Sequence, residues 1–146
     1  MVTVLPLQVT DRVRWDVLAR GYKTFYETVL ADAQYDATWL RLLREDDIYG
    51  LGAHVDGNLV GIAHYMFHTS AWSADACYLQ DLFVDKAARG QGVGRALIEG
   101  VAHAAQKRGA PRLYWLTHQN NATARTLYDK MAQYKGFIRY DYPLPD

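Results

Sequence analysis

The segment "DLFVDKAARGQGVGRALIEG", residues 81–100, passes from an apolar run to a helical pattern through three alternating glycines, Gly90, Gly92 and Gly94. A strand, a glycine loop and a helix N-terminus together form an anion site, because unpaired N–H groups and the helix dipole both point at the ligand. Glycine lacks the Cβ atom that would hold a phosphate away from the backbone. The segment therefore predicts a phosphate site, and a diphosphate would use the whole arc of amides.

Two nucleotide-binding motifs compete for this loop. A P-loop needs lysine and serine or threonine after its glycines, but arginine and alanine follow Gly94. A dinucleotide fold needs Gly-x-Gly-x-x-Gly and a later acidic residue at a strand end, whereas the later strand here ends in Thr117 and His118. Arg89 and Arg95 add positive charge at the two edges of the loop, although a glycine-rich turn with a solvated arginine is the simpler alternative.

The rest of the chain alternates strand and helix signals around this segment. The pair Asp56-Gly57 between apolar runs is a strong hairpin signal. Apolar residues at every fourth position from Val93 predict a helix, and Gly109 is expected to end it. The order predicts a mixed sheet covered by helices, as one α/β (α+β) domain over residues 1–146. Expected strands are 2–9, two within 48–68, 76–85, 112–119 and 136–143, and expected helices are one after residue 10, 36–46, 92–108 and 121–134.

Composition excludes several classes of protein. The 146 residues carry 16 basic and 16 acidic side chains, and this balance argues against a nucleic-acid binder. A single cysteine, Cys77, excludes an internal disulfide and cannot alone build a zinc site. The start of the chain does not read as a signal peptide, and no apolar run is long enough to span a membrane. We therefore expect a cytoplasmic protein with no membrane partner.

Three stretches of the sequence carry a family resemblance over about residues 56–140. The loop reads Arg89-Gly90-Gln91-Gly92-Val93-Gly94, and it is similar to the Arg/Gln-x-x-Gly-x-Gly/Ala motif of the GNAT superfamily of acyl-CoA-dependent N-acyltransferases. The stretch "YLQDLFVD", residues 78–85, resembles the fourth strand of that family, especially in its polyamine and yeast-type histone acetyltransferase branch. The stretch "NNATARTLYDKM…GF" resembles the Asn-x-x-Ala-x-x-Phe/Leu-Tyr segment of the family, with matches at Asn121, Ala124, Leu127 and Tyr128.

The resemblance implies a fold and a cosubstrate. It implies a mixed, mostly antiparallel central sheet of about six to seven strands, flanked by about four helices, with splayed fourth and fifth strands. Gly136 lies eight residues after Tyr128, which is longer than is common and suggests an extra helical turn. The implied cosubstrate is acetyl-CoA, with no metal. The implied binding residues are Leu82, Phe83, Val84, Arg89, Gly90, Gln91, Gly92, Val93, Gly94, Arg95, Asn121, Ala124 and Tyr128.

The resemblance also assigns Tyr128 as general acid to the departing coenzyme A thiolate. A phenol of ordinary pKa, about 10, suits that role, and a packing tyrosine is the alternative. Asn121 is seven residues earlier on the same helix face, where it can bind the cofactor arm or cap the helix. The base is left open: Gln80 stands where some relatives carry glutamate, and Asp81 points to the opposite face unless a bulge intervenes. His118 is a further option, and His54, His64 and His68 lie in or beside the expected hairpin with no better support.

The acyl acceptor is expected to be a small-molecule amine or a lysine side chain. Acidic residues of the first half could attract it, although a solvated helix face is the commoner use of such charges; these are Glu27, Asp32, Asp36 and the run Glu45-Asp46-Asp47. The family resemblance further suggests a homodimer. A catalytically weak acyl-CoA-binding module and a redox or nucleotide-binding fold remain as alternatives to an N-acetyltransferase.

Overall fold

The computed structural model describes residues 1–146, which separate into two compact units, residues 1–115 and residues 116–146. The second unit contains α4 (Ala122–Met131). Short 3₁₀ turns, η1 (Val9–Asp11) and η2 (Lys86–Ala88), precede α1 and the glycine loop. The first unit contains β1 (Val2–Pro6), α1 (Arg12–Phe25), α2 (Asp32–Arg44), β2 (Tyr49–Val55), β3 (Asn58–His68), β4 (Ala76–Val84), α3 (Val93–Arg108) and β5 (Leu113–Tyr114).

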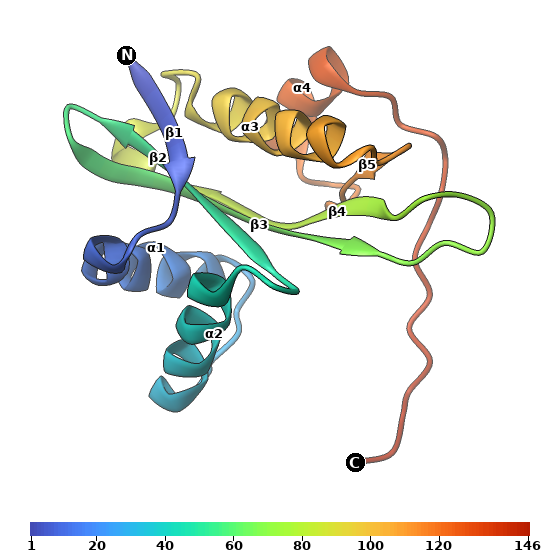
Figure 1. Ribbon diagram of the computed structural model, residues 1–146, viewed down its shortest axis with the longest axis horizontal. Coiled ribbons are helices and arrows are strands. Elements are labelled where there is room, and N and C mark those ends of the chain that lie inside the picture. The colour runs from blue at the N-terminus through green and yellow to red at the C-terminus, as the bar shows by residue number, and fades with distance from the viewer. The chain divides into compact units, whose positions relative to one another are not determined.

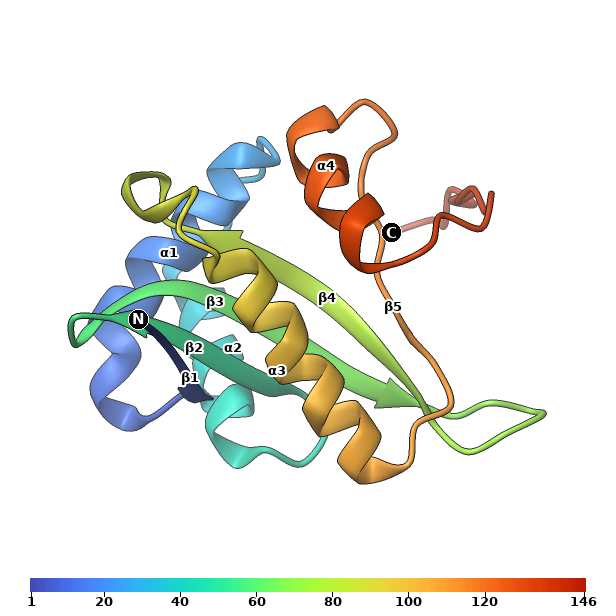
Figure 2. The same cartoon turned by 90° about the horizontal axis from the view of Figure 1, so that it is seen from above.

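The five strands form one sheet in the order β1-β2-β3-β4-β5. The first four strands are antiparallel to their neighbours, and β5 runs parallel to β4. Helices α1 and α2 lie on one face of this sheet and α3 on the other (Figure 1), and the view from above shows α3 crossing it (Figure 2). The predicted mixed, mostly antiparallel fold with four helices is confirmed, with five strands in place of the expected six to seven.

The hairpin between β2 and β3 forms where the sequence predicts it. Asp56 and Gly57 both have positive φ, at 51° and 80°, which is the conformation of a two-residue turn whose twist matches its strands. Gly109 has φ 82° and ends α3, as its position after the apolar periodicity predicts. These two turns therefore follow from local chemistry alone.

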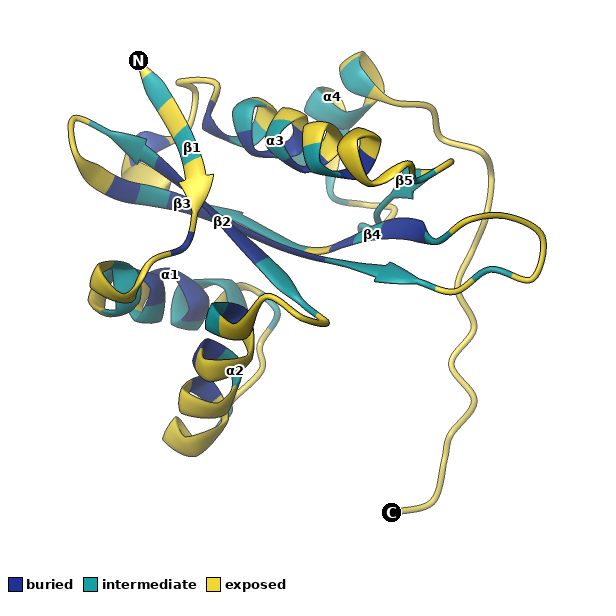
Figure 3. Cartoon of the chain, in the orientation of Figure 1, coloured by how far each residue is buried: buried dark blue, intermediate teal, exposed yellow.

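Buried residues lie along the strands and on the helices that cover both faces of the sheet (Figure 3). Trp15 of α1 and Leu42 of α2 are each 1% exposed and belong to one cluster with Ile62 of β3. On the other face, Leu97 of α3 is fully buried. Cys77 of β4 is also fully buried, and burial raises the pKa of its thiol to about 11.

Three expected elements differ from the observed ones. The strand expected at residues 112–119 is limited to Leu113–Tyr114, and no strand forms over residues 136–143. The expected extra turn after Tyr128 is wrong, since α4 ends at Met131. Alternating apolar residues satisfy strand propensity, but a strand also needs a ladder partner, and Phe137 and Tyr140 stay exposed. The single-domain assignment for residues 1–146 stays a prediction.

Candidate active site

One edge of β4 is open along most of its length. Only Cys77 and Tyr78 pair with β5, opposite Leu113 and Tyr114. The other edge of the segment 82–84 pairs with β3. Unpaired backbone groups on an open edge accept an added extended chain. The splayed strands that the resemblance implies are therefore present, and Leu82, Phe83 and Val84 lie at the opening.

The glycine loop presents a line of unpaired amides. Gly90 and Gly92 have positive φ, at 82° and 78°, and a Cβ atom built on either glycine meets no heavy atom within 4 Å. The N–H of Ala96 donates to the carbonyl of Gly92 at 3.0 Å. The amides of the residues between them, Val93 to Arg95, therefore precede the first bond within α3. This open cradle fits a diphosphate, because each ligand oxygen can meet an N–H donor.

The two arginines of the loop differ in their surroundings. The Nε of Arg89 donates to the carbonyl of Val84 at 3.2 Å, and its guanidinium lies 5.7 Å from the Phe83 ring centre. Arg95 lies 3.8 Å from Glu99 one turn later. Arg89 therefore connects the glycine loop to the end of β4 by a hydrogen bond. The charge of Arg95 is partly compensated by Glu99.

The second unit holds the remaining predicted site residues. The Oδ1 of Asn121 accepts from the N–H of Ala124 at 3.4 Å, and its Nδ2 donates to Oγ1 of Thr117 at 3.2 Å. Asn121 thus caps α4, which is the alternative role that its position suggested. Tyr128 lies two turns later and is partly buried. The structure therefore groups residues 82–84 with 89–95 in the first unit and Asn121, Ala124 and Tyr128 in the second.

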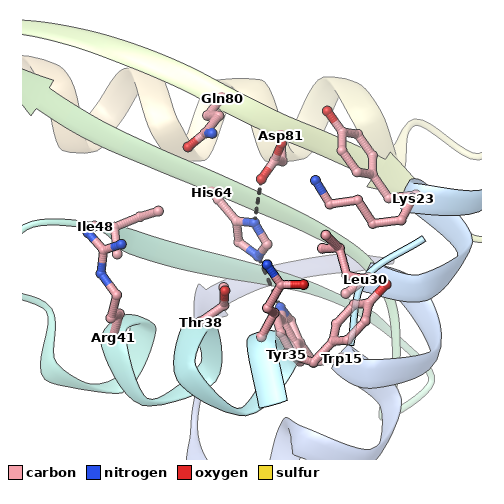
Figure 4. Close-up of a pocket in the computed structure, with 13 residues that line it drawn as sticks. Trp15, Lys23, Leu30, Tyr35, Thr38, Arg41, Ile48, His64, Gln80 and Asp81 are labelled. Carbon is pink, nitrogen blue, oxygen red and sulfur yellow. Dashed lines mark hydrogen bonds and ion pairs between the residues drawn. The ribbon is translucent and has the colours of Figure 1, made fainter. Parts of the chain in front are cut away.

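A cavity of about 190 Å³ lies within the first unit (Figure 4). Its walls come from α1, α2, the residues around them and the strands β3 and β4. Asp81 is the sole carboxylate that lines it. Lining side chains are Trp15, Ala19, Tyr22, Lys23, Leu30, Gln34, Tyr35, Thr38, Arg41, Ile48, His64, Gln80 and Asp81.

A β-bulge in β4 places Asp81 at this cavity. His64 of β3 lies opposite Asp81, but the next residue, Tyr65, lies opposite Leu79. Gln80 is therefore an extra residue that the β3 ladder does not match, and a bulge of this kind re-aims the neighbouring side chains. Gln80 and Asp81, which simple alternation would send to opposite faces, consequently both line the cavity.

A hydrogen-bonded chain leads from Asp81 into the core. Nδ1 of His64 lies 2.9 Å from Oδ2 of Asp81, and the indole Nε1–H of Trp15 donates to Nε2 of His64 at 3.0 Å. Both bonds are drawn in Figure 4. His64 is only 5% exposed, and sequence reasoning gave it no more support as a site residue than His54 or His68. No local signal marks it, because Trp15 and Asp81 are distant from His64 in the sequence.

Asp81 and Tyr22 shift each other's acid–base behaviour. Burial by itself raises the pKa of Asp81, but hydrogen bonds from His64 and Tyr22, with the attraction of Lys23, hold that pKa below its usual range. Burial and the neighbouring carboxylate raise the pKa of the Tyr22 phenol well above its ordinary value. At neutral pH the cavity therefore contains an ionised carboxylate and a protonated phenol.

Arginines form ion pairs with most of the acidic residues that the sequence analysis considered as groups that could attract an amine acceptor. Asp32 lies 2.8 Å from Arg20, Asp46 lies 3.8 Å from Arg44, and Asp36 pairs with Arg12. Such exposed pairs are weak but leave little net charge to draw in a cation. Asp47 likewise pairs with Arg41, at 3.1 Å.

The other histidines have different partners. His54 lies 3.2 Å from Asp11, and Nε2 of His68 lies 2.9 Å from the Tyr114 hydroxyl. Neither residue lines the cavity. His118 belongs to the second unit and is exposed.

The sequence profile of the acetyltransferase (GNAT) family matches residues 15–132, and the chain belongs to this family. A D-amino-acid N-acetyltransferase, HPA3 of Saccharomyces cerevisiae, is 33% identical over 135 residues, which cover 90% of this chain and 84% of that protein. A thialysine N-epsilon-acetyltransferase of Bos taurus is 27% identical over 120 residues, 82% of this chain and 71% of that protein.

Solved structures share the fold at low sequence identity. A complex of AAC(6')-Iy with a bisubstrate analogue has a TM-score of 0.87 at 17% identity and matches 99% of both chains. A ribosomal-protein-alanine N-acetyltransferase from Brucella melitensis has a TM-score of 0.83 at 24% identity, over 99% of this chain and 100% of that one.

The chain is therefore an N-acetyltransferase, and acetyl-CoA is its cosubstrate. The structure contains no cluster of three or more histidine, cysteine or acidic side chains arranged to hold a metal ion. None of its helices combines the length and apolar character needed to cross a bilayer.

The lowered pKa of Asp81 makes a stability prediction for Asp81→Asn. Ionised Asp81 contributes stability that is complete above its unfolded pKa, about 3.9, and that is lost as pH falls through the lower folded pKa. The wild-type free energy of unfolding should therefore exceed that of Asp81→Asn by a constant amount near neutral pH, and the gap should narrow below about pH 4. Urea titrations followed by tryptophan fluorescence measure it.

Asp56→Asn is the matched control, because Asp56 is exposed in the hairpin turn. Its unfolding free energy should follow that of the wild type at every pH. A gap between wild type and Asp81→Asn that widens on acidification would contradict the assignment.

Proposed function

We propose that the enzyme transfers the acetyl group directly from acetyl-CoA to the primary amine of a small molecule. The observation that carries the proposal is the cavity beside the opening of β4, with the ionised carboxylate of Asp81 in its wall. A carboxylate there can hold an ammonium group. Direct transfer is also supported by Cys77, the one cysteine, which is fully buried and does not line the cavity.

The glycine loop is our candidate for the diphosphate site. The amides from Gln91 to Arg95 would donate to phosphate oxygens, and Arg89 would add longer-range attraction. The open edge at Leu82 to Val84 would pair with the amide-bearing arm of the cosubstrate. When bound there, acetyl-CoA supplies an activated thioester, and a backbone N–H near this edge can polarise the carbonyl.

Tyr128 is the proposed general acid. Its hydroxyl would donate a proton to the leaving thiolate, as the family resemblance implies. Asn121 and Ala124 lie on the same helix, and Asn121 fixes the start of that helix by capping it. The cap therefore supports the orientation of the helix turn that carries Tyr128.

An acceptor ammonium must lose a proton before attack, since an amine of pKa about 10.4 is mostly protonated at neutral pH. Asp81 is held ionised and is a weak base, so its proposed part is to bind the ammonium. Gln80 cannot accept a proton but can orient a water. We propose that the proton leaves through ordered water, without a single dedicated base.

For the acceptor we propose an amino acid with a free carboxylate. Lys23 and Arg41 line the same cavity as Asp81, so the cavity offers both an anion and cations to a zwitterion. Arg41 is compensated by Asp47, whereas Lys23 reaches from α1 toward Asp81 (Figure 4). The names of the two curated relatives, which acetylate D-amino acids and thialysine, support this class.

A catalytically weak acyl-CoA-binding module is the second candidate. The observation that favours it is Gln80 at a cavity position where some relatives carry glutamate. The homodimer and the cytoplasmic location expected from the sequence stay predictions.

Gly92→Val should raise the dissociation constant for acetyl-CoA about tenfold or more, a loss of at least about 1.4 kcal/mol. The added side chain would project into open space where phosphate is expected to approach. Isothermal titration calorimetry measures the constant. Gly109→Val is the matched control, because Gly109 also has positive φ and an open Cβ position but lies at the far end of α3. Equal affinity in the two variants would contradict the cradle.

Tyr128→Phe should lower kcat by about 10² to 10⁴, the usual range for loss of an acid catalyst. Thiol release from acetyl-CoA measures kcat, and calorimetry should show the cosubstrate still bound. Tyr142→Phe removes a hydroxyl from a tyrosine that is 84% exposed and should leave both values unchanged. A wild-type protein that binds acetyl-CoA but releases no thiol with any amine would favour the binding module.

The acceptor class is tested with D-phenylalanine and phenethylamine, which differ only by the carboxylate. Wild-type kcat/KM should favour D-phenylalanine by about tenfold or more, and Lys23→Met should reduce that ratio toward one by removing the cation. If Lys23→Met does not change the ratio of the two kcat/KM values, Lys23 does not bind the carboxylate of the acceptor.

A further inference from the structure

We infer that Trp15 and His64 are positioning residues that keep the carboxylate of Asp81 uncompensated, so that Asp81 binds the ammonium group of the acceptor. The inference rests on the proposed function, because it assigns roles within the acceptor cavity. It concerns a chain of two hydrogen bonds that joins α1, β3 and β4.

The hydrogen bonds determine which nitrogen of His64 carries the proton. An indole nitrogen can only donate, so Nε2 of His64, 3.0 Å from Nε1 of Trp15, must accept. A neutral imidazole then carries its proton on Nδ1, which faces Oδ2 of Asp81 at 2.9 Å. Trp15 is 1% exposed and His64 is 5% exposed, so bulk water does not compete for these bonds.

The same geometry opposes a charged His64. An imidazolium carries hydrogens on both nitrogens, and the one on Nε2 would face the N–H of Trp15. Two buried donors directed at each other are costly, because neither is satisfied. His64 therefore remains neutral, and Asp81 receives a hydrogen bond without an adjacent full positive charge. An imidazolium in this place would pair with Asp81 and cancel the charge that the acceptor needs.

The other groups around Asp81 do not replace this role. From α1, Tyr22 donates as a neutral phenol, and Lys23 acts on Asp81 electrostatically, without an ion pair within 4 Å. From α2, Arg41 is paired with Asp47. Gln34, Thr38 and Gln80 complete the polar lining as neutral groups. Because Asp81 is the one carboxylate in the cavity wall, an acceptor ammonium has no other anion there to bind.

Trp15→Phe tests this role kinetically. Without the indole N–H, no donor faces Nε2, so a second proton can bind His64 at low pH without a clash between donors. We expect KM for D-phenylalanine, at saturating acetyl-CoA, to rise relative to wild type by about tenfold at about pH 6 and by much less at about pH 8. We expect kcat to change less than KM, because the carboxylate binds the amine in the ground state.

Trp39→Phe is the matched control. Trp39 is 4% exposed and packs against Trp15 with ring centres 5.0 Å apart, so it produces a similar packing loss without touching His64. Its KM relative to wild type should not depend on pH. A Trp15→Phe ratio that is also independent of pH, or that Trp39→Phe reproduces, would overturn the inference.

Nitrogen NMR of the imidazoles tests the chain of bonds without any turnover. In ¹⁵N-histidine-labelled wild type, His64 should show a protonated Nδ1 and an unprotonated Nε2 throughout about pH 6 to 8, with its signals assigned by their loss in His64→Leu. A protonated Nε2 in wild type would overturn the inference, whatever the kinetics. If the enzyme does not acetylate D-phenylalanine, the proposed acceptor is wrong. The NMR spectrum would still show which tautomer His64 adopts, and so would still test the inference.

Discussion

The register between β3 and β4 is the constraint on which the cavity depends. Sheet pairing normally sends adjacent side chains to opposite faces, but the unmatched residue Gln80 lets Asp81 line the same cavity as its neighbour. The strand therefore supplies a carboxylate on one side while its other edge stays open beyond Tyr78. Under the proposed function, the bulge at Gln80 and the unpaired edge beyond Tyr78 would determine where the amine and the thioester meet.

Charge compensation is the basis of the acceptor class that we propose. Arginines of α1 and α2 neutralise the acidic residues around the two helices, so the surface offers little net attraction to polycations. Inside the cavity the carboxylate of Asp81 accepts hydrogen bonds from His64 and Tyr22, while Lys23 lies nearby without a close ion pair. For this reason our proposed acceptor is a ligand that carries both charges close together, rather than a chain of amines.

Features set by neighbouring residues were predictable from the sequence, and features set by long-range pairing were not. The Asp56-Gly57 turn, the left-handed Gly90 and Gly92, and the start of α3 at Val93 follow from local conformational preferences. The His64–Asp81 contact needs the register of two strands, and the Trp15–His64 contact needs a helix packed on the sheet. The apolar alternation after Gly136 predicted a strand, but residues 136–143 pair with no strand of the sheet.

The burial of Cys77 has a redox consequence. Each turnover releases coenzyme A with a free thiol, and once that thiol has been oxidised to a disulfide it can exchange with an accessible protein thiolate. The single cysteine is fully buried with a pKa of about 11, so it forms almost no thiolate at neutral pH and is shielded from solution. The protein can therefore release this thiol repeatedly without forming a mixed disulfide with its own product.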